Sequence, residues 1–332
     1  MNRFPTFALL TLLTAATACE TVVDVPEPAH TPQLALRYIL GTTAQDTAAR
    51  AFFAHRQLFI STSQRLYDTR PLQGRSDATA RLFDEAGTVV EEFRAGRPFS
   101  YYGSGFGDTL GYYEPTRNFV PQPGRTYRLQ VEAPGVDVIE SRLTLPGAPA
   151  QLLGGRFART ASSDPYETRG RLTVSIQDDG ATTDAYLAFA RVVDSTGAAL
   201  LSAGVFPDYE ANDADTDLQG AQLELSFPGN LSGLLPYPDT DVAGRAFPLT
   251  TNVVVSGYNP QPGMSGLPAG ARLEVTISRL TLDTYRFLVS LRRYTDTDGN
   301  IFAEPAPLIS NVEPGYGVFG GAVDATVRMP LN

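Results

Sequence analysis

The amino-acid sequence predicts an all-β fold: an immunoglobulin-like β-sandwich followed by a larger β-rich domain, sandwich or barrel-like, that contains one α-helix. Short stretches alternate apolar and polar residues with a period of two, which is the pattern of half-buried strands. Glycine, proline, asparagine and aspartate residues interrupt these stretches roughly every ten residues, as the turns of a sandwich do. One stretch, residues 281–294, instead spaces its apolar residues by three and four positions, which favours a helix.

The first domain is predicted to cover residues 33–146 with about seven strands. A polar loop, residues 42–50, joins the first two strands, and a long loop rich in glycine and tyrosine occupies residues 98–113. Proline and glycine in residues 146–149 cannot continue a sheet, so they mark the domain boundary. The expected strands are 33–40, 57–61, 77–83, 88–93, 118–120, 126–132 and 139–145.

The second domain is predicted to cover residues 151–332. A length of 332 residues fits two domains, since a domain usually holds about 100 to 200 residues. An acidic loop occupies residues 208–217, and Thr281 or Ser278 is expected to cap the helix. The expected strands are 170–177, 185–194, 223–227, 253–257 and 272–277.

The first residues of the chain have the pattern of a secretory leader. Arg3 provides a positive charge, residues 4–13 are mostly apolar, and a run of small residues leads to Cys19, the only cysteine. Because a cysteine at such a cleavage position is typical of bacterial lipoproteins, residues 1–18 are predicted to be a lipoprotein signal peptide and Cys19 the lipidated residue. The alternative is an ordinary signal peptide followed by a free thiol. The proline-rich residues 19–32 are predicted to form an extended tether.

Charge and composition exclude some classes of partner. The formal net charge is −10 at pH 7, and the chain contains arginine but no lysine. Such an acidic chain repels phosphate groups, so no nucleic acid is expected as a partner. No second apolar run of about 18 residues follows Cys19, so the lipid anchor is the only membrane contact that the sequence predicts.

The C-terminal part of the chain resembles a known family. Residues 283–294 form a tyrosine-bearing helical pattern, followed by Ile-Phe-Ala-Glu-Pro at 301–305, Ser-Asn-Val at 310–312 and Gly-Tyr-Gly-Val-Phe-Gly at 315–320. The turn Pro-Gly-Arg-Thr-Tyr at 123–127 fits the same pattern. Together these steps resemble the Bacteroidota lipoprotein family called domain of unknown function 4249, with valine and tyrosine in place of the usual isoleucine and leucine.

This resemblance implies an envelope lipoprotein that is often encoded near TonB-dependent receptors. It implies attachment to the outer membrane through Cys19, on either the periplasmic or the cell-surface face, with a TonB-dependent outer-membrane receptor as partner. The family offers no catalytic residues to transfer. The predicted function is therefore a non-catalytic accessory or ligand-binding partner of such a transporter. The alternative is a structural or adhesive surface module without a transported ligand.

Few residues have the pattern of a catalytic site. His30 and His55 are the only histidines, and neither a Gly-x-Ser-x-Gly motif nor a histidine pair at metal-binding spacing occurs. A serine or cysteine triad needs a histidine held by two partners, and His30 falls in the predicted tether. The sequence does not exclude a catalytic pair of carboxylates of the kind that glycosidases use. The sequence predicts a protein that is not an enzyme.

One stretch has the composition of a calcium site. Asp296, Asp298, Asn300 and Glu304 place oxygen-bearing side chains at alternate positions, which suits a hard cation. The alternative is a plain turn, because the glycine of this stretch stands at the fourth rather than the sixth position of a helix-loop-helix calcium loop. Asp213, Asp215 and Asp217 repeat the alternation in the acidic loop, with the same alternative. No other cofactor is expected.

The tyrosine-rich loop is the candidate recognition surface. Tyr101, Tyr102, Tyr112 and Tyr113 lie among glycines, and tyrosines on such loops bind sugars, peptides or protein faces by stacking and hydrogen bonding. The alternative is that these rings cover the edge of the sandwich.

Overall fold

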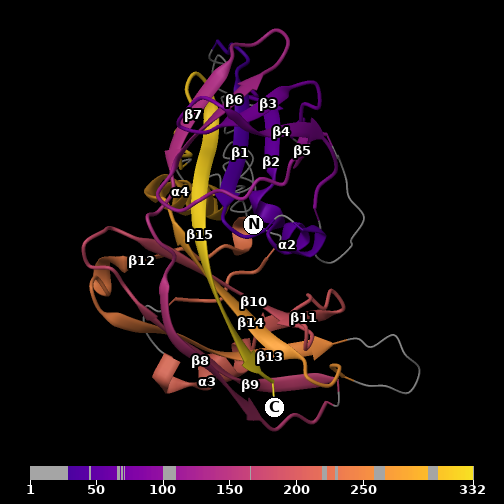
Figure 1. Ribbon diagram of the computed structural model, residues 1–332, viewed down its shortest axis with the longest axis vertical. Coiled ribbons are helices and arrows are strands. Elements are labelled where there is room, and N and C mark those ends of the chain that lie inside the picture. Colours follow the sequence, from indigo (N-terminus) through magenta and orange to yellow (C-terminus); the bar gives the residue numbers. More distant parts are fainter. Residues whose placement is uncertain are drawn as a thin grey trace, which may run out of the picture. The chain divides into compact units, whose positions relative to one another are not determined.

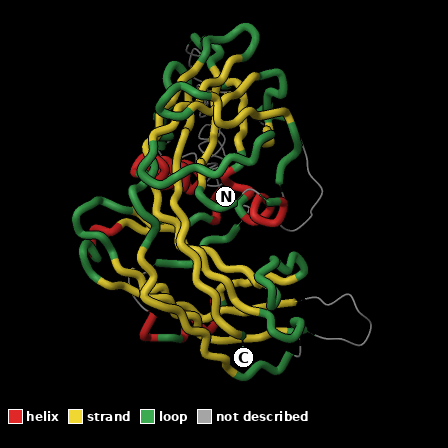
Figure 2. The backbone as a smooth tube through the Cα atoms, in the orientation of Figure 1, coloured by secondary structure: helices red, strands yellow, loops and turns green. Residues whose placement is uncertain are grey.

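The computed structural model describes residues 29–44, 46–65, 68, 70, 72–99, 110–164, 166–218, 223–228, 231–257, 266–297 and 306–331. The chain divides into two compact units, residues 1–31 with 64–70 and residues 32–63 with 71–332. The described helices and strands all belong to the second unit. Strands dominate it, and helices are short and few, which confirms the all-β prediction (Figure 2).

The strands form two sheets (Figure 1). The first sheet has eleven strands in the order β12 (Tyr237–Pro238), β10 (Ala185–Val193), β14 (Arg272–Leu280), β15 (Tyr316–Pro330), β1 (Leu34–Gly41), β2 (Leu58–Thr62), β5 (Tyr112–Pro115), β4 (Val89–Ala95), β3 (Thr79–Phe83), β6 (Thr126–Glu132) and β7 (Ile139–Thr144). The second has four strands in the order β11 (Ala203–Pro207), β13 (Ala246–Gly257), β9 (Glu167–Gln177) and β8 (Gln151–Thr160).

Three α-helices and four short 3₁₀ helices accompany the sheets in the described part of the chain. The α-helices are α2 (Thr47–Phe52), α3 (Tyr209–Ala214) and α4 (Leu282–Thr297). The 3₁₀ helices are η1 (Ala54–Arg56), η2 (Thr216–Leu218), η3 (Leu231–Gly233) and η4 (Asp239–Asp241). None of the described helices is both long enough and apolar enough to cross a membrane.

Strand β15 is the element that connects the large sheet. Its first half pairs in parallel with β1, from Tyr316 opposite Ala35 onward. Its second half pairs antiparallel with β14, and Figure 1 shows it as one long strand. Strands on both sides of residues 146–149 therefore belong to one hydrogen-bonded sheet. The division into domains 33–146 and 151–332 stays a prediction about folding units.

Three hydrophobic cores follow from this arrangement. The first lies between the four-stranded sheet and β10, β14 and the end of β15, with residues such as Leu172 and Ile277 fully buried. The second lies among strands β1 to β7 and contains Phe319 of β15. The third lies on the face of the large sheet that points away from the first two cores, and it contains Phe189 and Phe287. Alternate residues of β14 and β15 face different cores, because side chains of a strand alternate between faces.

Helix α4 confirms the helix that the sequence predicts at 281–294, and it extends three residues further. It buries Phe287 and Leu288 against the large sheet. The Thr281 hydroxyl oxygen accepts a hydrogen bond from the backbone N–H of Thr284 at 3.4 Å, as a cap does.

Three segments expected to be loops contain regular structure. Residues 42–50 include the start of α2, where Asp46 caps the helix by accepting a 2.8 Å hydrogen bond from the Ala49 N–H. Residues 208–217 include α3, which Asp208 caps in the same way. Residues 98–113 end in strand β5. The loop prediction is wrong for residues 47–50 and 209–214, because six-residue helices are too short to show a period and the aspartates that cap them resemble turn residues. Most of residues 98–113 lies outside the described residues, so the loop prediction there is wrong only for residues 112–113 of β5.

The C-terminal glycine motif serves close packing. A Cβ atom on Gly317, whose φ is 110°, would lie 1.8 Å from the Leu36 carbonyl oxygen of the parallel neighbour β1. A Cβ atom on Gly320 would lie 2.3 Å from the Thr284 hydroxyl of α4. Asn311 fixes the strand start, since its side chain accepts from the Phe319 N–H at 2.9 Å and donates to the Phe319 carbonyl at 2.9 Å. The motif therefore docks β15 against β1 and α4.

Candidate functional site

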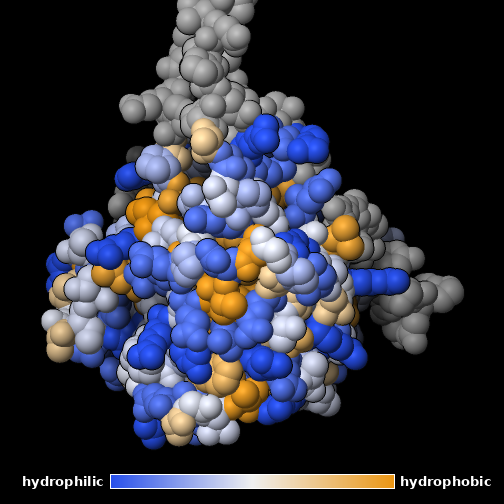
Figure 3. Space-filling view, turned by 90° about the horizontal axis from the view of Figure 1, so that it is seen from above, coloured by the Kyte–Doolittle hydropathy of each residue, from blue (hydrophilic) through white to orange (hydrophobic). Residues whose placement is uncertain are grey.

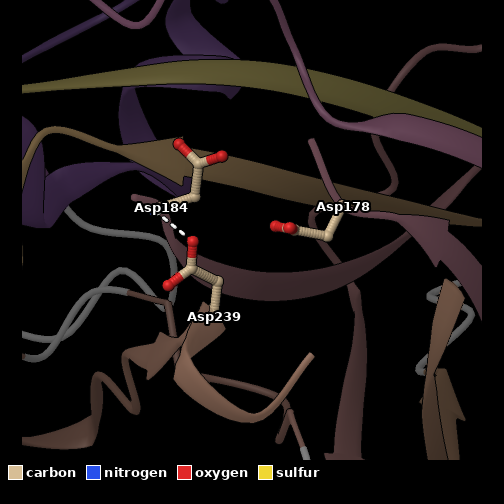
Figure 4. A group of neighbouring side chains, drawn as sticks. All are labelled: Asp178, Asp184 and Asp239. Atoms are coloured by element: carbon tan, nitrogen blue, oxygen red, sulfur yellow. Dashed lines mark hydrogen bonds between the residues drawn. The ribbon is translucent and has the colours of Figure 1, made fainter. Parts of the chain in front are cut away.

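Three buried aspartates from separate parts of the chain meet at one end of the sandwich core. Asp178 follows β9, Asp184 precedes β10 and Asp239 begins η4. One carboxylate oxygen of each lies within 4.8 Å of the others (Figure 4). Strand pairing brings two of them together, because Ala185 of β10 lies opposite Pro238 of β12. This group is called the aspartate cluster below.

Each carboxylate in the aspartate cluster has a donor from the protein. The Tyr186 hydroxyl donates to Asp178 Oδ1 at 2.6 Å, and the Gly244 N–H donates to Asp178 Oδ2 at 2.7 Å. The Asp184 N–H donates to Asp239 Oδ2 at 2.6 Å, while the Asp239 N–H donates to the Asp184 carbonyl at 3.0 Å. These bonds fasten the turn after β9 to the segment that follows β12.

Arg279 of β14 supplies the positive charge of the cluster. Its Nε donates to Asp184 Oδ1 at 2.6 Å, and its Nη2 donates to the Thr182 hydroxyl at 2.5 Å. The Thr182 hydroxyl in turn donates to Asp184 Oδ2 at 2.9 Å. Both side chains of the ion pair are almost completely buried, at 6% and 5% exposure. Ion pairs this deeply buried are strongly destabilised when one partner is removed.

The charges of the cluster are not balanced, because it holds three carboxylates and Arg279 forms an ion pair with one of them, Asp184. Burial, together with the negative charges of Asp178 and Asp184, raises the pKa of Asp239 above its ordinary value. Burial and the hydrogen bond to Asp178 raise the pKa of the Tyr186 hydroxyl, so Tyr186 is a neutral donor. Although burial alone lowers it, the hydrogen bond and charge of Asp184 raise the pKa of Arg279.

This geometry suits a structural link better than a cation site. Of the six carboxylate oxygens, only Asp239 Oδ1 has no donor among the described residues. Figure 4 shows the Asp184 side chain pointing away from Asp239, whose carboxylate meets the backbone of Asp184. A calcium ion takes six to eight oxygen ligands, so it would have to displace several of these hydrogen bonds.

A second buried cluster lies on the opposite face of β14. Arg56 of η1 forms a two-pronged ion pair with Asp324 of β15, with N–O distances of 2.7 and 2.8 Å. The Ser278 hydroxyl donates to Asp324 at 2.6 Å, and the Thr43 hydroxyl also donates to it. Although burial alone raises it, the charge and hydrogen bonds of Arg56 hold the pKa of Asp324 below its ordinary value. A Cβ atom on Gly41 would lie 2.2 Å from this guanidinium, so a larger residue there would have to displace Arg56 from its ion pair.

His55, the histidine outside the predicted tether, is a core residue. Its ring is 3% exposed and stacks on Phe189 at 5.1 Å between ring centroids. Its Nδ1 has no hydrogen-bond partner among the described residues. Burial, followed by the positive charges of Arg56 and Arg37, holds the pKa of His55 well below its ordinary value. The imidazole is therefore neutral at physiological pH.

The structure describes two of the four tyrosines in the candidate recognition surface. Tyr113 is 1% exposed, and its hydroxyl donates to the Arg75 carbonyl at 2.8 Å and accepts from the Ala78 N–H at 2.9 Å. It is a core residue of β5 rather than a loop residue. Tyr112 is half-buried and packs against Phe59 at 5.0 Å between ring centroids. Tyr101 and Tyr102 lie outside the described residues.

Only part of the other predicted sites falls within the described residues. Asp296 is exposed in the last turn of α4, whereas Asp298, Asn300 and Glu304 lie outside the described residues, as does Cys19. In the acidic loop, Asp215 forms an ion pair with Arg171 at 3.1 Å, and Asp213 is exposed on α3. The aspartate cluster is not predicted from the sequence, because Asp239 lies 55 residues after Asp184 and Asp178 looks like an ordinary turn residue.

The fold and these clusters define a class: an all-β protein of two packed sheets, with buried ion pairs that join strands of the larger sheet to other segments of the chain. The sequence profile of the domain of unknown function DUF4249 matches residues 54–328. The chain therefore belongs to the DUF4249 family, as the resemblance of its C-terminal motifs predicts. A search of curated proteins finds no match to this chain.

Proposed function

We propose that the protein is an outer-membrane lipoprotein, anchored through Cys19, that acts as a non-catalytic accessory or ligand-binding partner of a TonB-dependent transporter. The leader pattern before Cys19 supports the anchor, and membership of the DUF4249 family supports the envelope setting. Cleavage at Cys19 would leave the acidic body on the tether of residues 19–32.

The observation that carries the non-catalytic role is the way buried charges are used. Glu274 lies between Arg191 and Arg328, with N–O distances of 2.6 and 2.7 Å. Glu91 accepts hydrogen bonds from three backbone N–H groups of the turn at 116–119, at 2.7 to 2.9 Å. Together with the two clusters described above, these side chains hold strands and turns in place. Groups committed in this way are poorly suited to accept protons or attack a substrate.

Two open hollows support ligand binding rather than a purely structural role. One has a volume of about 300 Å³ and contains Phe119, Tyr127 and Arg125. The other has a volume of about 250 Å³, and its lining includes the buried Leu223 and the exposed Tyr209. Both hollows combine aromatic or apolar side chains with several polar and charged ones, which can fix the orientation of a small ligand.

The second candidate function is a structural or adhesive surface module without a transported ligand. On the face shown in Figure 3, hydrophilic residues predominate and hydrophobic residues form small separate patches. A mostly hydrophilic face favours weak or multivalent surface contact over a large permanent interface.

The test is a pull-down from detergent-solubilised native outer membranes, followed by mass-spectrometric identification of what is recovered. We expect one TonB-dependent receptor in a stoichiometric amount with the wild-type protein. The Cys19→Ala variant is the control, and we expect it to leave the membrane fraction. Recovery of the wild-type protein alone would contradict the transporter partnership and favour the structural or adhesive module.

A further inference from the structure

Strand β8 forms an open edge of the four-stranded sheet. It spans ten residues, Gln151–Thr160, and among the strands of the described part of the chain it pairs with β9 alone. Seven of its ten residues are exposed, and Phe157 alone is buried. An edge strand presents every second backbone N–H and C=O group to solvent, where another extended chain can pair with it.

The other three sheet edges are short or covered. Strand β12 has two residues and ends in Pro238, and β11 has five residues, mostly buried, and ends in Pro207. Strand β7 has six residues, and Glu140 at its outer side bridges to Glu313. Natural proteins usually blunt their edges in these ways. Strand β8 is the exception among the four, although a bulge at Leu152 and Gly154 interrupts its first residues.

The regular part of β8 is long enough to accept a partner strand. From Gly155 to Thr160 its register with β9 is continuous. Six residues extend over roughly 20 Å, which is the usual length of a strand in a sheet. Gly155 also lets this part pack closely on β15, because a Cβ atom there would lie 2.6 Å from the Met329 side chain.

The side chains of β8 give this edge a positive charge. Arg156 and Arg159 are both exposed, and neither has an ion-pair partner among the described residues. The arginines of the neighbouring strand are paired: Arg169 with Glu167 and Asp208, and Arg171 with Asp215. The chain has a net charge of −10, so two unpaired arginines on one edge make the charge of that edge opposite in sign to that of the whole protein. They attract an acidic strand and repel a second copy of β8.

We propose that β8 binds an extended, acidic segment of a partner protein by strand addition. The partner backbone pairs with residues 155–160, and its carboxylates meet Arg156 and Arg159 on opposite faces of the sheet. This inference rests on the proposed function in one respect, because it assumes that the protein binds a protein partner. It deepens that function by naming β8 as the surface that contacts the partner.

The experiment uses the purified full-length protein and a synthetic probe. The probe is a capped peptide of about ten valine and threonine residues with two glutamates three positions apart, the spacing of Arg156 and Arg159. Binding is measured by fluorescence anisotropy, and the contact is located by hydrogen exchange of residues 151–160. A peptide with lysines in place of the glutamates tests charge. An acidic peptide N-methylated at alternate residues tests backbone pairing.

We expect the acidic peptide to bind and to slow exchange in β8, and we expect both control peptides to bind poorly. The double variant R156E and R159E should weaken binding about tenfold or more, because it replaces two attractions by two repulsions. The matched control is Arg142→Glu, which changes an exposed, unpaired arginine on the edge strand β7 of the other sheet. It should leave binding unchanged.

Three results would overturn the proposal. One is equal binding of the N-methylated peptide, which would mean that charge alone attracts the probe. Another is binding with no protection of β8. The last is absence of binding together with self-association of the R156E and R159E variant, which would mean that the arginines only prevent edge-to-edge pairing. None of these results depends on lipidation or a transporter, so failure here and failure of the membrane pull-down are distinguishable.

Discussion

The two buried clusters on opposite faces of β14 differ in their balance of charge. Ser278 belongs to the pair of Arg56 and Asp324, where one positive charge meets one negative charge. The next residue, Arg279, belongs to the aspartate cluster, where one positive charge meets three carboxylates. Both are buried and both join distant parts of the chain. The first cluster is therefore a closed ion pair, whereas the second retains excess negative charge inside the protein.

This difference teaches that burial alone does not make a group of carboxylates a metal site. In the first cluster, any loss of charge leaves an unpaired ion. In the second, the loss of one carboxylate charge relieves repulsion, and the loss of the arginine increases it.

Asp324→Asn is expected to cost about 5 kcal/mol of unfolding free energy, because it leaves the Arg56 guanidinium buried without a counter-ion. Both side chains of this pair are at most 6% exposed. Urea unfolding at pH 7 measures the loss. Glu140→Gln, which removes the same charge from the exposed pair with Arg128, is the control and should cost under about 1 kcal/mol. Equal losses for both variants would mean that the buried pair contributes no more to stability than the exposed pair does.

Arg279→Met is expected to cost about 3 kcal/mol at pH 7, because three carboxylates then share the site without a cation. The loss should shrink as the pH is lowered toward 5, since the carboxylates of the variant can take up protons. Urea unfolding at several pH values measures both effects. Arg128→Met is the exposed control. A loss that does not depend on pH would contradict the charge imbalance, and recovery on addition of calcium would show that the cluster accepts a cation.

His55 is expected to make stability fall in mild acid. Its pKa in the folded protein is lowered, so below about pH 6.5 the unfolded chain binds a proton that the folded chain does not. Unfolding free energy should then fall by at most about 1.4 kcal/mol per pH unit, until the folded pKa is reached. His55→Phe should remove this slope, and His30→Phe should keep it. Parallel pH profiles for the wild-type protein and His55→Phe would contradict the prediction.

Asp239→Asn is expected to be neutral or to stabilise by under about 1 kcal/mol at pH 7. An asparagine oxygen still accepts from the Asp184 N–H, while one of three negative charges disappears. Because the pKa of Asp239 is raised, its carboxylate costs stability only as the pH rises above the ordinary value of 3.8, so the gain should vanish in acid. Thermal unfolding between pH 3 and pH 7 measures this. A clear loss at pH 7 would show that the charge itself is needed, and calcium titration of both proteins would then decide whether a cation uses it.

Local pattern was enough to predict much of the fold. The alternation of residues 170–177 predicts β9, whose inward residues Leu172, Val174 and Ile176 are all fully buried. The spacing of 281–294 predicts α4. The sequence pattern does not predict the short helices α2 and α3, because six residues are fewer than two helical turns and leave no period to detect.

The candidate sites were harder to predict, for a different reason. Tyr113 has a glycine-rich neighbourhood in sequence, but its position on β5 directs the ring into the core. The aspartate cluster contains no motif, because a turn after β9 and a 3₁₀ helix after β12 place its members together. Long-range contacts of this kind depend on which strands become neighbours.

The sequence by itself determined the all-β class, the helix at 281–294 and the family. Each of these depends on residues that are close in the chain, where side-chain period and turn chemistry act directly. The tertiary structure alone decided that β15 pairs with β1, that three buried aspartates lie together and that β8 is at the edge of its sheet. Backbone hydrogen bonds between strands are the same for every residue type, so local sequence carries little information about which strands pair.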